Sequence, residues 1–235
     1  MMRAAILATG LTLGAGAAEA ANAPSFEAVY DLRLTHASST TGPRAAVGTY
    51  DIKVAETCDG WDTKSHILLQ LAFRDDTESS NERFFSSWES KPGESKAGAH
   101  YRFAVRTVKN GKTVEAYKGT AALGKKGGSA RYEIPPPQGE TKPRVVELPL
   151  PRDTLFPAAH SQALLRRAEG GDALFKSVVL NGASSNGPRL MSTAIGPRVE
   201  NAAQPLPAEI DRALLGTPSW RMSSAFFNLN EQRDT

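Results

Sequence analysis

The chain has 235 residues, of which 40% are hydrophobic and 23% charged, and its net charge at neutral pH is +3. A nucleic-acid-binding protein is expected to carry clustered lysine and arginine and a more basic balance, so this composition argues against that function. A chain of this size can bury roughly 70% of its unfolded surface in one core. It can therefore fold without disulfide bonds, and it contains one cysteine, Cys58.

Residues 1–20 have the pattern of a secretory signal peptide. Arg3 supplies a positive charge, residues 4–17 are apolar, and Ala-Glu-Ala at residues 18–20 matches a cleavage site. The alternative, a membrane anchor, is disfavoured because the apolar stretch is short and rich in glycine and alanine. We therefore predict a cleaved signal peptide over residues 1–20 and a single domain over residues 21–235. A lone cysteine is unusual in the oxidising compartment that export implies.

Apolar and polar residues alternate along most of the remaining chain. In FEAVYDLRL, residues 26–34, the apolar Phe26, Ala28 and Tyr30 fall on one face and the charged residues on the other. A period of two with one polar face predicts a half-buried antiparallel strand whose apolar side chains point inward. Similar patterns predict strands over residues 49–57, 66–73, 82–90, 100–109, 112–121, 130–134, 143–150, 173–182, 188–196 and 219–230.

Turn signals separate the predicted strands. Asn110-Gly111 predicts a tight hairpin because both residues tolerate a positive φ. The run Pro135-Pro136-Pro137 predicts that the preceding strand ends at Ile134, since proline cannot join a central ladder. Three Gly-Pro-Arg tripeptides are interpreted as turns rather than as a binding repeat, at residues 42–44, 187–189 and 196–198.

One segment breaks the alternation and predicts a helix. In DTLFPAAHSQALLRRAEGG, Pro157 suits the first helical position and Gly170 suits a C-terminal cap, so a helix is expected over residues 157–169. PAEIDRALLG predicts a second short helix over residues 206–215. The sequence therefore indicates a mainly β, antiparallel protein with a helix inserted between two groups of strands.

The sequence contains no recognisable catalytic, metal-binding or cofactor-binding motif. The four histidines lack the spacing of metal ligands, and NGKT at residues 110–113 lacks the first glycine of a phosphate-binding loop. His160 is interpreted as a buried, hydrogen-bonded structural histidine, and Asp75-Asp76 as a solvated loop. We therefore predict a protein that is not an enzyme, with no catalytic residues, no metal and no cofactor.

Several aromatic residues lie in strand-like segments: Trp61, Trp88, Trp220, Phe226 and Phe227. They are interpreted either as ordinary core residues or as the lining of an apolar cavity within a curved sheet. The cavity alternative requires an open space beside Trp61, Phe73 and Phe103.

A succession of short motifs resembles a known family. AVYDLRL is followed by a polar loop, then by YDIKV, by CDGWDTK and, further along, by LFPAAH at the start of the predicted helix. This succession, from about Phe26 to the end of the chain, is similar to the EipB-like cell envelope integrity proteins. The resemblance implies a mainly β fold whose antiparallel strands form an open spiral or broken barrel, with one inserted α-helix.

The resemblance also implies a function. It implies a monomeric periplasmic protein that supports envelope integrity without catalysis, by association with other periplasmic proteins that include one built of tetratricopeptide repeats. The alternative is a periplasmic carrier or binder of lipid or another apolar ligand. The ligand-binding residues are not identified by the motifs.

For Cys58 the resemblance implies a disulfide bond. Family members bridge the cysteine in this position to a second cysteine near their C-terminus, whereas this chain has only Cys58. The resemblance therefore implies that the 235-residue chain lacks the C-terminal strands of the family, and with them the partner of Cys58.

Overall fold

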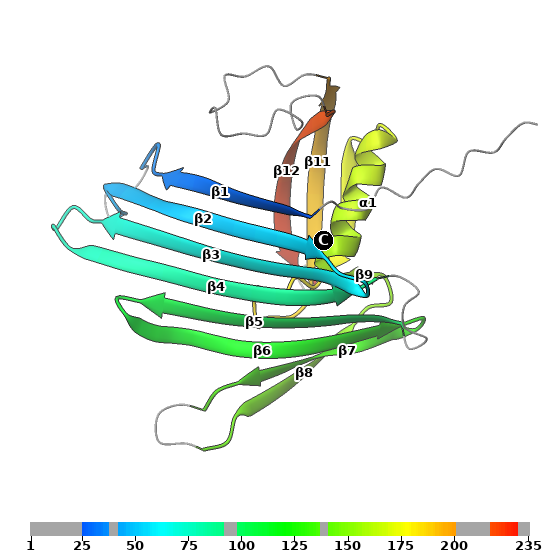
Figure 1. Cartoon of the computed structure of the whole chain (residues 1–235), viewed down its shortest axis with the longest axis horizontal. Helices are drawn as coiled ribbons and strands as arrows, with labels where there is room; N and C mark the ends of the chain where they lie inside the picture. The colour runs from blue at the N-terminus through cyan, green and yellow to red at the C-terminus, as the bar shows by residue number, and fades with distance from the viewer. Residues whose placement is uncertain (1–24, 38–41, 92–97, 137–140, 201–216, 230–235) are drawn as a thin grey trace, which may run out of the picture.

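The computed structural model describes residues 25–37, 42–91, 98–136, 141–200 and 217–229, and these are mainly β, as predicted. The described strands form an eight-stranded sheet, in the order β1 to β8, and a four-stranded sheet, in the order β12-β11-β10-β9. Figure 1 shows the second sheet standing across one end of the first, with its strands at a steep angle to those of the larger sheet.

The elements follow one another with short connections through most of the described chain. They are β1 (Phe26–Arg33), β2 (Ala45–Glu56), β3 (Gly60–Ala72), β4 (Glu78–Ser90), β5 (Ala99–Lys109), β6 (Lys112–Gly124), β7 (Gly127–Ile134), β8 (Arg144–Leu150), β9 (Thr154–Leu155), α1 (Pro157–Glu169), β10 (Leu174–Val179), β11 (Arg189–Val199) and β12 (Ser219–Asn228). The second predicted helix, over residues 206–215, lies outside the described residues.

The larger sheet is an antiparallel meander that does not close. Each strand pairs with the next along the chain, which leaves β1 and β8 as the edges among the described strands. The predicted hairpin between β5 and β6 is confirmed, since Asn110 and Gly111 have φ values of 49° and 76°. β7 ends at Ile134, as the following prolines predicted.

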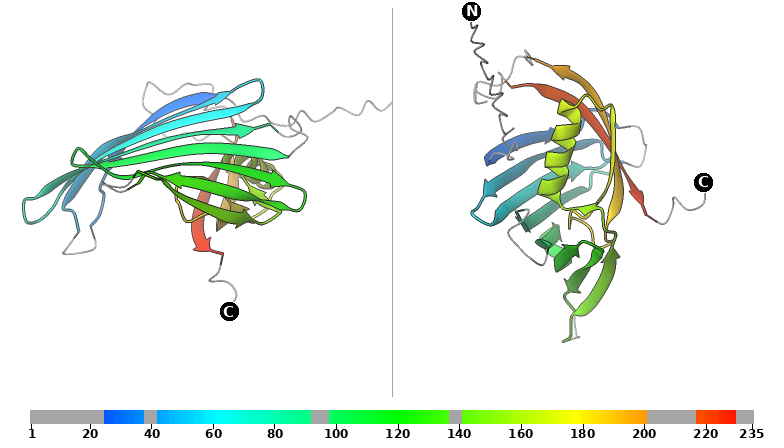
Figure 2. Two further views of the ribbon diagram at one scale, coloured as in Figure 1. Left: turned by 90° about the horizontal axis from the view of Figure 1, so that it is seen from below. Right: turned by 90° about the vertical axis from the view of Figure 1, so that its right-hand side faces the viewer.

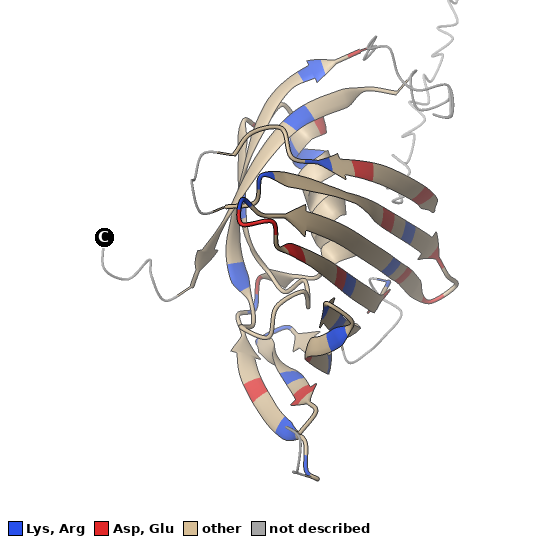
Figure 3. Cartoon of the chain, turned by 90° about the vertical axis from the view of Figure 1, so that its left-hand side faces the viewer, with Lys and Arg blue, Asp and Glu red and all other residues tan. Residues whose placement is uncertain are grey.

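Alternation along the strands gives this sheet two chemically different faces. We call the side that carries Tyr101, Phe103 and Val105 of β5 the core face, because all three side chains are buried. The opposite side, which carries Arg102 and Arg106, is called the outer face. Figure 3 shows lysine and arginine interspersed with aspartate and glutamate along the strands of this sheet.

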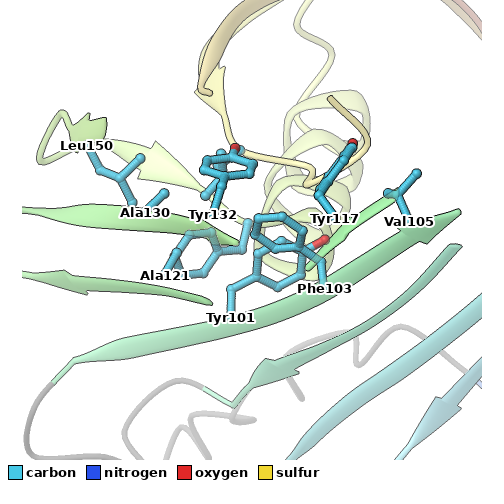
Figure 4. Packing of buried hydrophobic residues seen from close by; sticks show 10 residues of the cluster. Tyr101, Phe103, Val105, Tyr117, Ala121, Ala130, Tyr132 and Leu150 are labelled. Carbon is cyan, nitrogen blue, oxygen red and sulfur yellow. The ribbon is translucent and has the colours of Figure 1, made fainter. Parts of the chain in front are cut away.

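The core is an aromatic cluster on β5, β6 and β7. The rings of Phe103 and Tyr132 lie 5.2 Å apart in an edge-to-face arrangement, and Tyr101 stacks on Phe156 at 5.1 Å. Figure 4 shows the rings gathered on one side of the sheet. Phe156 and Leu180, which are 2% and 0% exposed, lie beside α1 and β10 and join the two sheets at this cluster.

The predicted helix is confirmed with the same bounds, Pro157–Glu169, with Pro157 in the first turn and Gly170 at the C-cap. The backbone N–H of Gly170 donates to the Arg166 carbonyl, and the following Gly171 takes the left-handed conformation with φ 82°. Such a glycine lets the chain leave the helix sharply. Figure 2 shows α1 lying against the second sheet.

Two details of the sequence prediction are wrong. Gly-Pro-Arg at residues 196–198 is not a turn but a bulge inside β11, where the register with β12 shifts between Ile195 and Arg198. A bulge accommodates proline because the extra residue makes no ladder hydrogen bond.

Phe26 and Tyr30 are not buried inward: they are 46% and 50% exposed, since the packed core lies under β5–β8 rather than under β1.

Candidate binding surfaces

The outer face carries a groove across β1 to β5 with a volume of about 530 Å³. The groove is lined by Glu27, Ala28, Val29, Asp51, Ile52, Lys53, Lys64, Ser65, His66, Phe84, Phe85, Ser86, Ala104, Val105 and Arg106. By strand register, two rows of outer-face residues form its sides, and a row of core-face residues between them contributes backbone to its floor.

One side of this groove is a stack of three side chains from neighbouring strands. The His66 imidazole stacks on the Phe84 ring at 4.5 Å, and the Arg106 guanidinium lies 4.1 Å from the centre of the same ring. The His66 Nδ1 lies 3.7 Å from the nearer carboxylate oxygen of Asp51, and its Nε2 lies 3.6 Å from that of Glu82. The imidazole therefore lies between two carboxylate groups and stacks on an aromatic ring.

A second, similar pair stands further along the same two strands. The Arg102 guanidinium lies 4.5 Å from the centre of a Trp88 ring. Phe84 and Trp88 of β4 face Arg106 and Arg102 of β5, respectively, in direct register. In the sequence, β4 shows only two aromatic residues four positions apart, and β5 shows only two arginines four positions apart. Their pairing becomes visible only when the register of the two strands is known.

Glu89 is a buried carboxylate on the core face that the sequence analysis did not identify. It is 4% exposed, and its two oxygens accept hydrogen bonds from the backbone N–H groups of Ala158 and Ala159 at 2.6 and 2.9 Å. Burial raises the pKa of Glu89 to about 7, although the two N–H donors act in the opposite direction. The N-cap residue of α1, Phe156, has no side-chain cap, so Glu89 from a distant strand performs that role.

The segment after β10 is held by side chains of the larger sheet. The Tyr101 hydroxyl donates to the Asn181 carbonyl at 2.7 Å, and the Tyr117 hydroxyl donates to the Gly182 carbonyl at 3.2 Å. Arg83 donates to the Ala183 carbonyl. Burial raises the pKa of Tyr117 to about 12 and also raises the pKa of Tyr101, so both hydroxyls keep their protons and remain donors.

The open edges of the two sheets expose apolar side chains. On β1, Phe26, Val29 and Tyr30 are 46%, 66% and 50% exposed, and on β12, Phe226 and Phe227 are 43% and 42% exposed. Apolar residues therefore lie on both faces of β1, which is an edge strand in the described part of the sheet.

The family follows from comparison of the whole chain with known proteins. A model of the EipB-like family matches residues 17–235. The chain belongs to the EipB-like family. The curated "Cell envelope integrity protein EipB" of Brucella abortus (strain 2308) is 25% identical over 247 residues, which cover 99% of this chain and 81% of that protein.

A solved structure is similar to this EipB-like fold. The crystal structure of a beta-barrel-like protein of a domain of unknown function, from Brucella abortus, superposes with a TM-score of 0.69 at 16% identity. The match covers 88% of this chain and 81% of that one. It supports the predicted open, barrel-like architecture.

The predicted aromatic residues of this EipB-like chain do not line one cavity. Trp61 is buried on the core face of β3, and Phe103 belongs to the aromatic core, each only 4% exposed. Trp88 lies on the outer face under Arg102, and Trp220 lies on β12 beside Arg198. The core interpretation therefore holds for Trp61, and Phe103, which the cavity alternative required as a lining residue, is a core residue as well. Trp88 and Trp220 lie on other surfaces.

His160 is buried, as predicted, at 7% exposed, and its ring stacks on Phe175 at 5.7 Å. The predicted hydrogen bond is not seen at its Nε2, which has no partner in the described structure. Burial lowers the pKa of His160, which favours the neutral imidazole. Within the described ranges, no group of three His, Cys, Asp or Glu side chains could hold a metal ion.

Cys58 lies in the tight turn between β2 and β3 and is an exposed free thiol. The turn is closed by Thr57, whose N–H donates to the Gly60 carbonyl at 2.8 Å and whose hydroxyl accepts from the Gly60 N–H at 3.0 Å. The disulfide bond of Cys58 stays a prediction.

In the part of the chain that the structure describes, no helix has the length and apolar character needed to cross a membrane.

Proposed function

We propose that this EipB-like protein is a non-enzymatic periplasmic protein that supports cell envelope integrity by binding other envelope proteins. The envelope role is suggested by the name of its Brucella abortus relative. The binding mode is suggested by one observation: among the described strands, β1 is an edge strand with exposed apolar side chains on both of its faces.

An extended segment of another protein matches the chemistry of this edge. The free side of an edge strand presents backbone N–H and C=O groups that pair naturally with a further strand. Strand addition obtains affinity from these hydrogen bonds and specificity from alternate side chains. On β1 the core-face residues Phe26 and Tyr30 and the outer-face residue Val29 are available for such side-chain contacts.

Photo-cross-linking in the native envelope tests this proposal. A photoreactive phenylalanine analogue in place of Val29 is expected to form a discrete adduct with an envelope protein. Val114 is the matched control, because it is also a valine, is 60% exposed and lies on β6, away from the β1 edge.

The two positions must differ for the proposal to stand. The adduct from position 29 should be much stronger than any adduct from position 114, and Tyr30→Lys should weaken it, because a charge on an edge strand opposes strand addition. Equal yields from both positions, or no adduct from position 29, would show that β1 is not the contact surface.

Carriage of an apolar ligand is the second candidate. It is supported by the apolar side chains on the core face of β2 and β3, which lie beyond the aromatic core and are only half-buried: Tyr50, Ile52, Ile67 and Leu69. If this face holds a ligand, native mass spectrometry of protein purified gently from the periplasm should detect a lipid or another apolar mass bound to it. A bare protein under these conditions would count against the carrier function.

A further inference from the structure

We propose that the outer face binds an extended ligand that carries more than one phosphate group, by means of Lys64, Arg102 and Arg106. The site lies on β3, β4 and β5 and involves the outer face rather than the β1 edge. Its centre is the cross-strand pair Ser86 and Ala104, which stands between the two arginine–aromatic stacks in the sheet register.

The two guanidinium groups have unused hydrogen-bonding capacity. In the described structure, Arg102 and Arg106 contact the Trp88 and Phe84 rings, and neither makes an ion pair with a carboxylate. A guanidinium has five N–H donors in one plane, which suits the oxygens of a phosphate group. Stacking on an aromatic ring leaves the edges of that plane available and restricts the side chain before a ligand arrives.

The neighbouring lysines indicate a surface that tolerates a concentration of positive charge. Lys53 and Lys64 are direct cross-strand partners on β2 and β3, an arrangement of like charges that destabilises a sheet. Lys53 pairs with Glu27 at 3.0 Å, whereas Lys64 makes no ion pair with any described residue. Lys64 in turn lies directly opposite Ser86, so its charge stands beside the centre of the proposed site.

The shape of the surface favours an extended ligand. Ser86 and Ala104 have small side chains, so the surface between the two stacks is recessed and forms part of the outer-face groove. Phe84 and Trp88 are four residues apart on one strand, which corresponds to roughly 13 Å. Two carboxylates also line the groove: Glu27, which is neutralised by Lys53, and Asp51, which lies beside His66.

Binding of short-chain inorganic polyphosphate to the purified protein tests this site directly. Replacing both arginines, Arg102→Gln with Arg106→Gln, is expected to weaken polyphosphate binding about tenfold or more, because two charge-assisted contacts are lost. The matched control is Lys125→Gln with Lys126→Gln. It removes the same charge from two adjacent lysines in an exposed turn.

A third variant separates geometry from charge. Arg102→Lys with Arg106→Lys keeps both charges but loses the planar donors, so its affinity should fall between those of the wild type and the double glutamine variant. Thermal melts of each variant verify folding, which the exposed positions of both arginines should preserve. No polyphosphate binding by the wild type, or an equal loss in the arginine and lysine double glutamine variants, would overturn the proposal.

Vesicle binding distinguishes the two possible sources of the phosphate groups, a lipid headgroup and a soluble ligand. Binding to vesicles of phosphatidylglycerol that polyphosphate displaces would support the site and identify a lipid headgroup as the ligand. Polyphosphate binding without vesicle binding would support the site and identify a soluble phosphate-bearing ligand. Vesicle binding that is unaffected by the double arginine replacement would contradict it.

Discussion

Replacing Gly182 with alanine is expected to lower the free energy of unfolding by about 3 kcal/mol, as the sum of a left-handed backbone penalty and a steric clash. Gly182 has φ 68°, and a Cβ atom there would lie 2.5 Å from the Cγ of Phe103. Phe103 is a buried member of the aromatic core and has little room to move. The Gly182 carbonyl also accepts the Tyr117 hydroxyl bond, which a shifted backbone would weaken.

Gly111→Ala is the control for this experiment. Gly111 also has a positive φ, of 76°, but a Cβ atom there would meet no atom within 4 Å. It should therefore lose only the backbone penalty of about 1 kcal/mol. Urea denaturation of both variants measures the difference. In a double-mutant cycle, Gly182→Ala should cost less in a Phe103→Ala background, which lacks the clashing Cγ and Cδ1 atoms. Equal losses in the two alanine variants would show that contact with Phe103 does not matter.

Glu89→Ala is expected to lower the free energy of unfolding by about 2 kcal/mol at neutral pH, because it removes the acceptor for two N–H groups at the start of α1. Ala158 and Ala159 would lose their partners at 2.6 and 2.9 Å, and Phe156 cannot supply another. Chemical denaturation monitored by circular dichroism measures this loss. Glu89→Gln keeps one acceptor oxygen, so its loss should be smaller.

The same carboxyl group predicts a pH dependence of stability. In the folded protein the pKa of Glu89 is raised to about 7 from an ordinary 4.5. Between these values the folded state holds the proton that the unfolded state releases, so stability should fall as the pH rises from about 4.5 to about 7. The full change from this group is about 3 kcal/mol, and the contribution is fully present only below about pH 4.5.

Denaturation curves across this pH range distinguish Glu89 from other carboxylates. Glu89→Gln should flatten the decline, because the amide does not titrate, whereas the exposed Glu147→Gln should leave it unchanged. A decline that survives in Glu89→Gln would show that this carboxyl group is not its source.

Local patterns in the sequence were sufficient for much of the fold. The bounds of α1 follow from Pro157 and Gly170, and the β5–β6 hairpin follows from two residues that tolerate positive φ. Alternation identified most of the strands, because a period of two is a local property of the backbone. The motifs that resemble the EipB-like family were also readable, and the family match covers them.

The same alternation could not say how deeply either face of a strand is buried. In β4, Phe84 and Trp88 lie on one face and Phe85 and Glu89 on the other, so both faces mix apolar and polar residues. The face that carries Glu89 becomes the core face because α1 and the segment near Leu180 pack there. Likewise, Phe26 and Tyr30 have the pattern of buried residues but lie beyond the packed core.

The sequence by itself therefore determined the family, the strand periodicity, the principal turns and the helix of this protein. Tertiary structure alone decided which residues meet: Glu89 caps a helix that begins 68 residues later, at Pro157, and the Tyr101 hydroxyl binds a carbonyl 80 residues away. It also placed Arg102 and Arg106 over two aromatic rings of the neighbouring strand. The physical reason is that periodicity and turn propensity act over a few residues, whereas capping, burial and charge pairing depend on how distant strands are brought together.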